Sequence, residues 1–124
     1  MPVTSQVMEN AKASEAAAAF KEAGNKCYKE EDNEGALVNY TKAIDACEDI
    51  NDEKLLATCL KNRAAVYLKF EDFESVITDC TRALDLVPND PKTLFRRCQA
   101  HEGLYLPIVK ELKTSTYPSN YLLG

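Results

Sequence analysis

Residues 60–97, which read LKNRAAVYLKFEDFESVITDCTRALDLVPNDPKTLFRR, decide the fold. Apolar residues recur at helical spacing on both sides of the central FED turn, and a proline ends the second run. An Asp-Pro pair then predicts the start of another helix. Asn62, Lys92 and Arg96 fall at helix positions that should share one face. Such a cluster of donors favours a negatively charged ligand.

The composition limits the fold and the partners. At 124 residues the chain is long enough for one domain, and 45% apolar residues are ordinary for a globular fold. The net charge of −5 argues against a nucleic-acid surface, because binding to phosphates requires a basic face. Any anion site must therefore be local.

Five cysteines and one histidine, His101, do not form a recognisable metal site. No CxxC pair is present, so neither a zinc site nor a cofactor is expected. Each thiol lies where a helix accommodates a small apolar residue, which predicts buried, reduced cysteines. They are Cys27, Cys47, Cys59, Cys80 and Cys98.

The N-terminal residues have no apolar run typical of a secretory signal, and nowhere does the chain approach the roughly 20 apolar residues of a membrane span. We therefore expect a cytoplasmic protein with no membrane partner. Residues 1–13 are polar and predict a disordered N-terminus, with Ser14 as the cap of the first helix.

The apolar pattern predicts an all-α chain with five helices. The second helix should begin at Asp32 or Asn33, and Asp72 should cap the fourth. The fifth is expected over about Pro91–Glu102. Gly24 lies inside the first helix, where glycine costs roughly 1 kcal/mol, so we expect a neighbouring helix to approach closely there.

The helix pairs repeat. Phe20 matches Leu60 40 residues later, which in turn matches Leu94 34 residues further on, and Gly24 and Ala64 share a small position. Helix–turn–helix units of this period, with small residues where helices cross, resemble the tetratricopeptide repeat. The resemblance implies a solenoid of antiparallel helix hairpins with about two and a half repeats over residues 14–104.

Residues 105–124 depart from this pattern and read as a divergent tail, a truncated or alternative third repeat. Pro107 and Pro118 interrupt it, and its helical candidate is short, at Ile108–Leu112. The fifth helix then lacks the helix that should cover it. Self-association through this uncovered face is expected.

Polar donors recur on the first, third and fifth helices, with no carboxylate among them. The set resembles the dicarboxylate clamp of tetratricopeptide co-chaperones. The resemblance implies that it binds the C-terminal acidic (EEVD-type) tail of heat-shock protein 90, heat-shock protein 70 or both. The matching residues are Lys21, Asn25, Asn62, Lys92 and Arg96, and Tyr28, Ala65 and Lys69 match positions that line the same groove.

Within the family, the run from Leu60 onwards looks most like the N-terminal domain of UCS-type myosin co-chaperones, which implies a link to myosin folding only for a longer relative. No nucleophile motif, phosphate loop or Cys–His arrangement is present, so an enzyme is not expected, and His101 is interpreted as a partly buried packing residue. The alternative function is a scaffold module that binds an internal peptide or helix without requiring a terminal carboxylate.

Overall fold

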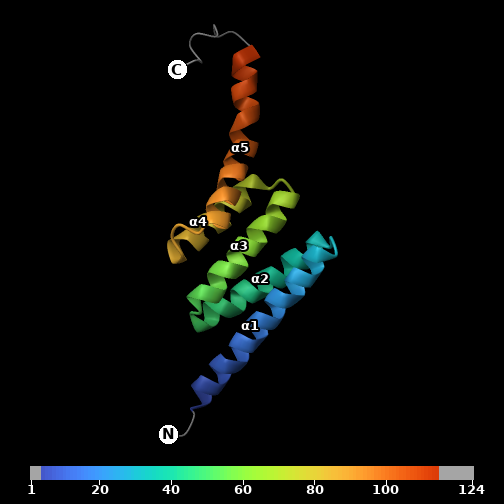
Figure 1. Ribbon diagram of the computed structural model, residues 1–124. Helices are drawn as coiled ribbons and strands as arrows, with labels where there is room; N and C mark the ends of the chain where they lie inside the picture. Colours follow the sequence, from blue (N-terminus) through green and yellow to red (C-terminus); the bar gives the residue numbers. More distant parts are fainter. Residues whose placement is uncertain (1–3, 115–124) are drawn as a thin grey trace.

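The computed structural model describes residues 4–114, which form five α-helices stacked as an elongated array (Figure 1). The all-α prediction is confirmed. α1 packs on α2, α3 packs on both α2 and α4, and α5 packs mainly on α4. The helices are α1 (Ser5–Lys29), α2 (Asn33–Ile50), α3 (Glu53–Lys69), α4 (Phe73–Leu86) and α5 (Pro91–Thr114).

The turns between the first four helices share one design. An aspartate before each helix accepts a hydrogen bond from a backbone N–H in the first turn: Asp32 from Gly35, Asp52 from Leu55 and Asp72 from Ser75. The residue before each aspartate is left-handed, with φ between 55° and 61°. This conformation lets the aspartate N–H reach back to a carbonyl five residues earlier, which closes the preceding helix.

The core consists of small side chains and a few large ones. One cluster lies where the α1–α2 hairpin meets α3 and α4, and it contains Ile44 and Leu60 among alanines and cysteines. The expected close approach at Gly24 is confirmed: a Cβ there would lie 2.6 Å from the ring of Tyr40. The small residue at position 24 thus allows α1 and α2 to pack closely.

Three of the five cysteines fit the prediction of buried thiols. Cys47, Cys59 and Cys80 are fully buried, whereas Cys27 is half-buried. Burial raises the pKa of Cys59 to about 12 and that of Cys80 to about 11. The prediction is wrong for Cys98, which is exposed on α5. The cause is the absence, within residues 4–114, of a helix over that face of α5.

The start of α1 corrects the sequence prediction. The helix begins at Ser5 rather than after Ser14, and Thr4 caps it by accepting a hydrogen bond from the Val7 N–H at 3.2 Å. Residues 5–12 are exposed, so this mostly polar segment has no buried apolar stripe to indicate a helix. Good local helix formers and a cap extend the helix without packing. Residues 1–3 lie outside the described part.

The end of α5 corrects it as well. The helix continues from the predicted end at Glu102 to Thr114 and includes Pro107. The expected separate helix at Ile108–Leu112 is therefore part of α5. Pro107 removes one backbone N–H donor from the helix, yet the helix is continuous through it. The remainder of the predicted tail, residues 115–124, lies outside the described residues.

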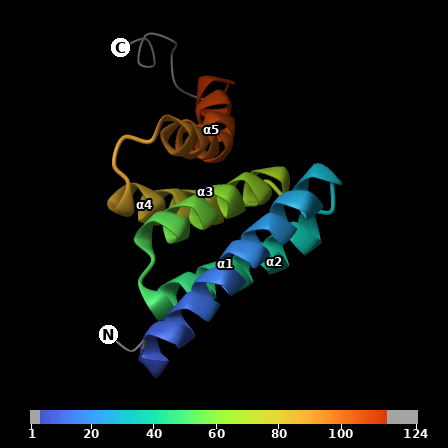
Figure 2. The same ribbon diagram turned by 60° about the horizontal axis from the view of Figure 1, so that its bottom comes forward.

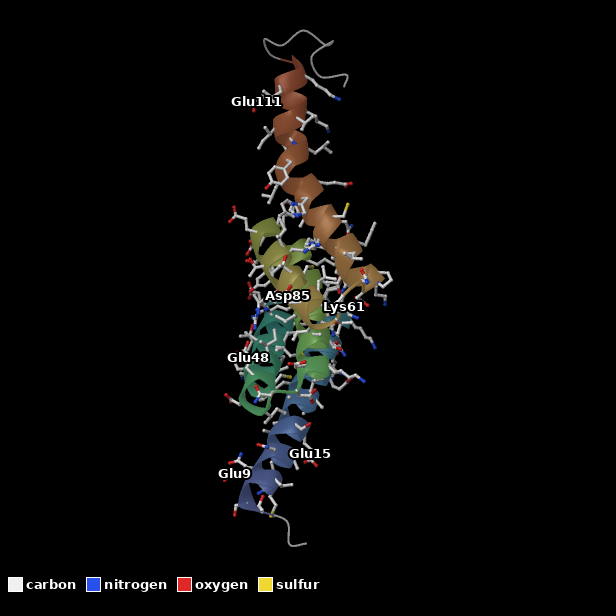
Figure 3. All side chains as sticks on the ribbon, turned by 90° about the vertical axis from the view of Figure 1, so that its left-hand side faces the viewer. Glu9, Glu15, Glu48, Lys61, Asp85 and Glu111 are labelled. Carbon is white, nitrogen blue, oxygen red and sulfur yellow. The ribbon has the colours of Figure 1, made fainter. Side chains whose placement is uncertain are left out.

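α5 is anchored only at its first half. Thr93 and Ala100 are buried, and Gly103 lies against the ring of Phe73 from α4. Beyond this contact the helix stands clear of the other four, as the ribbon views show (Figure 1, Figure 2). In a view from the side, Glu111 lies far along this projecting end (Figure 3).

Candidate peptide-binding groove

Side chains of α1, α2, α3 and α5 enclose a hollow of about 170 Å³, here called the amide pocket. Five of the eight residues predicted from the sequence line it, namely Asn25, Tyr28, Asn62, Ala65 and Arg96. Lys29 and Tyr40 complete the lining. Residues far apart in the chain therefore meet, because the repeat places the same face of α1, α3 and α5 side by side.

Asn25 and Asn62 are linked to each other and to the core. The Asn25 Oδ1 accepts a hydrogen bond from the Tyr40 hydroxyl at 2.5 Å and a longer one from Asn62 Nδ2 at 3.4 Å. Tyr40 is almost fully buried, and burial, assisted by nearby Cys59, raises its pKa to about 12. The phenol therefore stays neutral and keeps donating its proton to Asn25. Asn25 is held in one orientation before any ligand arrives.

Arg96 is positioned by the backbone of α3. Its Nη1 donates a hydrogen bond to the Lys61 carbonyl at 3.1 Å. A guanidinium has five N–H donors in a planar fork, so this bond leaves others for a ligand in the pocket. α5 thus contributes a cation whose position depends on the docking of α5 against α3.

A second hollow of about 330 Å³, here called the side pocket, continues the groove along α3. It shares Tyr28, Ala65 and Arg96 with the amide pocket. Lys69 lines the side pocket and lies 5.8 Å from the centroid of the Tyr28 ring, a cation–π distance. Gln99 from α5 closes the other side.

Lys21 and Lys92 line neither pocket. Lys21 lies 3.6 Å from the carboxylate of its neighbour Glu22, and Lys92 is exposed. Each precedes by four residues a predicted partner that does line the amide pocket, so both project from the same helix faces. Their part in a binding site remains a prediction.

The two pockets are lined by positive charge, whereas the chain as a whole is negative. The linings contain the cations Lys29, Lys69 and Arg96 and no carboxylate, in a chain whose net charge is −5. Amide and guanidinium donors in such a setting suit a carboxylate, which requires several charge-assisted hydrogen bonds to offset its loss of water.

Sequence reasoning missed two features of the site. The first is Tyr40, which belongs to the apolar stripe of the second helix; its ring lies against Gly24 between α1 and α2, and its hydroxyl reaches the groove. The second is the ion pair between Asp79 of α4 and Arg63, which follows Asn62 on α3. Asp79 is only 2% exposed and receives two guanidinium hydrogen bonds, at 2.7 and 2.8 Å. An aspartate beside the apolar stripe of α4 was the available signal.

Other kinds of site are not found in the described part of the chain. Among residues 4–114 no group of His, Cys, Asp or Glu side chains is arranged to hold a metal ion. None of the helices in the same range is both long enough and apolar enough to cross a membrane.

The fold and the groove define a class of helix-hairpin repeat proteins that present donors from alternate helices. No family model matches the sequence. The chain is 43% identical over 85 residues to protein unc-45 homolog B of Danio rerio, and 41% identical over 88 residues to the human mitochondrial import receptor subunit TOM70. These matches cover 68% and 71% of this chain but only 9% and 14% of the two relatives.

Among solved structures, the Arabidopsis OM64 TPR domain superposes with a TM-score of 0.64 and 34% sequence identity, covering 80% of this chain and 75% of that one. The chain belongs to the tetratricopeptide-repeat family. Its similarity to the unc-45 homologs confirms the predicted resemblance to UCS-type myosin co-chaperones.

Proposed function

We propose that this chain is a non-catalytic peptide-binding module that grips the C-terminal acidic tail of heat-shock protein 90, heat-shock protein 70 or both. The amide pocket carries the proposal, because Asn25, Asn62 and Arg96 from three helices meet there without a carboxylate. The similarity to an import receptor subunit supports a binding role. We propose the cytoplasm as the place of action.

Each pocket residue has a role in this proposal. Arg96 offers a fork that can bind one carboxylate through two hydrogen bonds, and Asn62 offers an amide N–H₂ beside it. Tyr28 and Ala65 provide apolar contact for the ligand's side chains, between the two pockets. Lys21, Lys69 and Lys92 would approach the ligand's remaining charges, because a lysine is a flexible point charge.

A second candidate is the binding of an internal peptide without a terminal carboxylate. The side pocket supports it, since Leu68 and Gln99 extend the groove beyond the amide pocket. An extended segment could cross both pockets. A contribution to myosin folding is proposed only for a longer protein, because this chain spans about a tenth of the unc-45 relatives.

Calorimetric titration with a peptide ending in Met-Glu-Glu-Val-Asp tests the proposal. We expect micromolar binding that weakens with salt and is abolished when the peptide's C-terminus is amidated. Equal affinity for the free and amidated peptides would favour the internal-peptide module instead.

Arg96→Ala and its neighbour Arg97→Ala form a matched pair for the same titration. Arg96 lines the amide pocket. Arg97 projects from another face of α5 and donates a hydrogen bond to Thr81 of α4. Loss of charge-assisted bonds should weaken binding about 10- to 100-fold for Arg96→Ala, following roughly 1.5–3 kcal/mol, and little for Arg97→Ala. Equal effects of the two substitutions would contradict the assigned pocket.

A further inference from the structure

Within residues 4–114, one face of α5 lacks the cover that the corresponding face of α3 receives. The positions of Leu60, Ala64 and Tyr67 on α3 correspond to positions 34 residues later on α5. On α3, Leu60 and Ala64 are fully buried, and Tyr67 packs with residues of α4. The counterparts on α5 are all exposed, and they are Leu94, Cys98 and His101. His101 is therefore not the partly buried packing residue expected from the sequence.

The exposed stripe continues beyond the repeat. Leu94, Cys98, His101, Tyr105 and Ile108 follow one another at intervals of four, three, four and three residues, and all five are exposed. This alternation is the spacing of the core residues of a coiled coil, along which two helices pair. We call these five residues the α5 seam. At 1.5 Å per residue the seam is about 21 Å long, or four turns.

The side chains on both flanks of the seam identify its occupant. Arg97 and Leu104 lie on one flank, and Glu102 and Val109 lie on the other. In a parallel, in-register pair of helices, the flanking residue just before a core position on one helix faces a flanking residue of the partner. That partner residue has a sequence number five higher. Arg97 then faces Glu102 of a second copy, and Leu104 faces Val109. Each contact occurs twice, and both are complementary.

An antiparallel arrangement fits the same flanks less well. It brings the two copies of Glu102 to the same side of the seam, where like charges repel. Arg97 is able to serve the parallel pair, because it spends only one of its donors on Thr81, at 3.3 Å.

From these positions we propose that the chain forms a parallel dimer through the α5 seam, in which each copy supplies the covering helix that residues 4–114 of the other do not provide. The face of α5 that holds Thr93, Ala100 and Gly103 stays packed within its own copy. Arg96 lies on that side, against α3. The dimer therefore leaves the amide pocket open, and it does not depend on the proposed peptide binding.

Sedimentation equilibrium of the full 124-residue chain tests the dimer. Ile108→Glu and Val38→Glu make a matched pair, because both residues are 53% exposed and only Ile108 lies on the seam. We expect concentration-dependent dimerisation of the wild type and of Val38→Glu, and at least tenfold weaker dimerisation of Ile108→Glu. Circular dichroism checks that both variants keep their helix content. A monomeric wild type, or equal behaviour of the variants, would overturn the proposal.

Two further variants test the parallel register. Arg97→Glu should weaken the dimer by placing two acids opposite each other, and the double variant Arg97→Glu, Glu102→Arg should restore it. Restoration fails if the two residues do not face each other, and that result would overturn the register.

Cross-linking provides an independent check. In the parallel register Cys98 faces Cys98 of the second copy, so treatment with diamide should join two thiols as a disulfide while the diamide accepts their two protons and two electrons. Cys98→Ser should remove the covalent dimer. A dimer that does not cross-link, or that still does so in Cys98→Ser, would contradict the parallel seam.

Discussion

α3 and α5 occupy equivalent places in the repeat, yet only α3 is enclosed. Helices α2 and α4 flank α3, and its apolar residues are buried or half-buried. α5 rests on α4 and α3 along one side, and large apolar residues such as Phe95 remain exposed on the other. The sequence of a repeat helix thus defines an apolar surface, and packing of the next helix decides whether this surface is buried.

The enclosed region should depend most strongly on its buried ion pair. Arg63→Ala should lower the free energy of unfolding by about 3–5 kcal/mol, because it strands the Asp79 carboxylate, which is 2% exposed, without its partner. Urea unfolding followed by circular dichroism measures the change.

Arg82→Ala is the matched control for that substitution. Arg82 pairs with Glu48 across α4 and α2, but both side chains are more than 40% exposed. We expect a loss of about 1 kcal/mol or less. A similar loss in the two variants would mean that burial does not distinguish the pairs.

Two glycines allow the enclosed and open regions to be compared directly. Gly24→Ala should lower the free energy of unfolding by about 1–3 kcal/mol, since the new Cβ would lie 2.6 Å from the Tyr40 ring between two packed helices. Gly103→Ala creates a similar clash with Phe73, at 2.4 Å. There α5 is free to shift outward, and the gain in helix propensity of roughly 1 kcal/mol offsets the clash.

The midpoint of thermal unfolding measures both substitutions. We expect a clear decrease for Gly24→Ala and a small change for Gly103→Ala. Equal decreases would indicate that α5 is held as firmly as α1, and the contrast between enclosed and open helices would then fail.

A smaller effect is expected at the link between core and groove. Tyr40→Phe removes the hydrogen bond to Asn25 and should cost about 0.5–1.5 kcal/mol at neutral pH. Folding raises the pKa of Tyr40 from 10.0 to about 12, so the folded state favours the neutral phenol. This contribution is complete below pH 10 and is lost as the pH rises through about 12.

Urea unfolding at several alkaline pH values tests the sign of this effect. The difference in stability between wild type and Tyr40→Phe should shrink as the pH rises from about 10 to 12. A difference that is constant, or that grows, would contradict the assigned role of the buried phenol.

Much of this architecture could be predicted from periodicity. The apolar stripes identify the five helices, and the requirement for a close approach at Gly24 follows from the cost of glycine in a helix. The ends of α1 and α5 could not be predicted in this way, because residues 5–12 and 105–113 are exposed, and no packing within the chain marks where either helix stops.

The site was predicted in identity more than in arrangement. Residue type and spacing identify Asn25, Asn62 and Arg96, which meet in the amide pocket. The same spacing assigns Lys21 and Lys92 to the site. Their side chains are long and have several rotamers, so the sequence does not determine where the ammonium groups lie. The position of the Tyr40 hydroxyl depends on the angle between α2 and α1. The pattern of residues along the sequence does not contain this angle.

The placement of Tyr28 and Tyr40 has a spectroscopic consequence. The chain contains six tyrosines and no tryptophan, so its near-ultraviolet absorption and fluorescence arise from phenols. Both of these rings line the amide pocket, and Tyr40 also donates its hydrogen bond there. A ligand that competes for the amide of Asn25 would change the environment of a chromophore inside the groove. Tyrosine absorption and fluorescence of the unmodified chain should therefore report whether a ligand occupies the amide pocket.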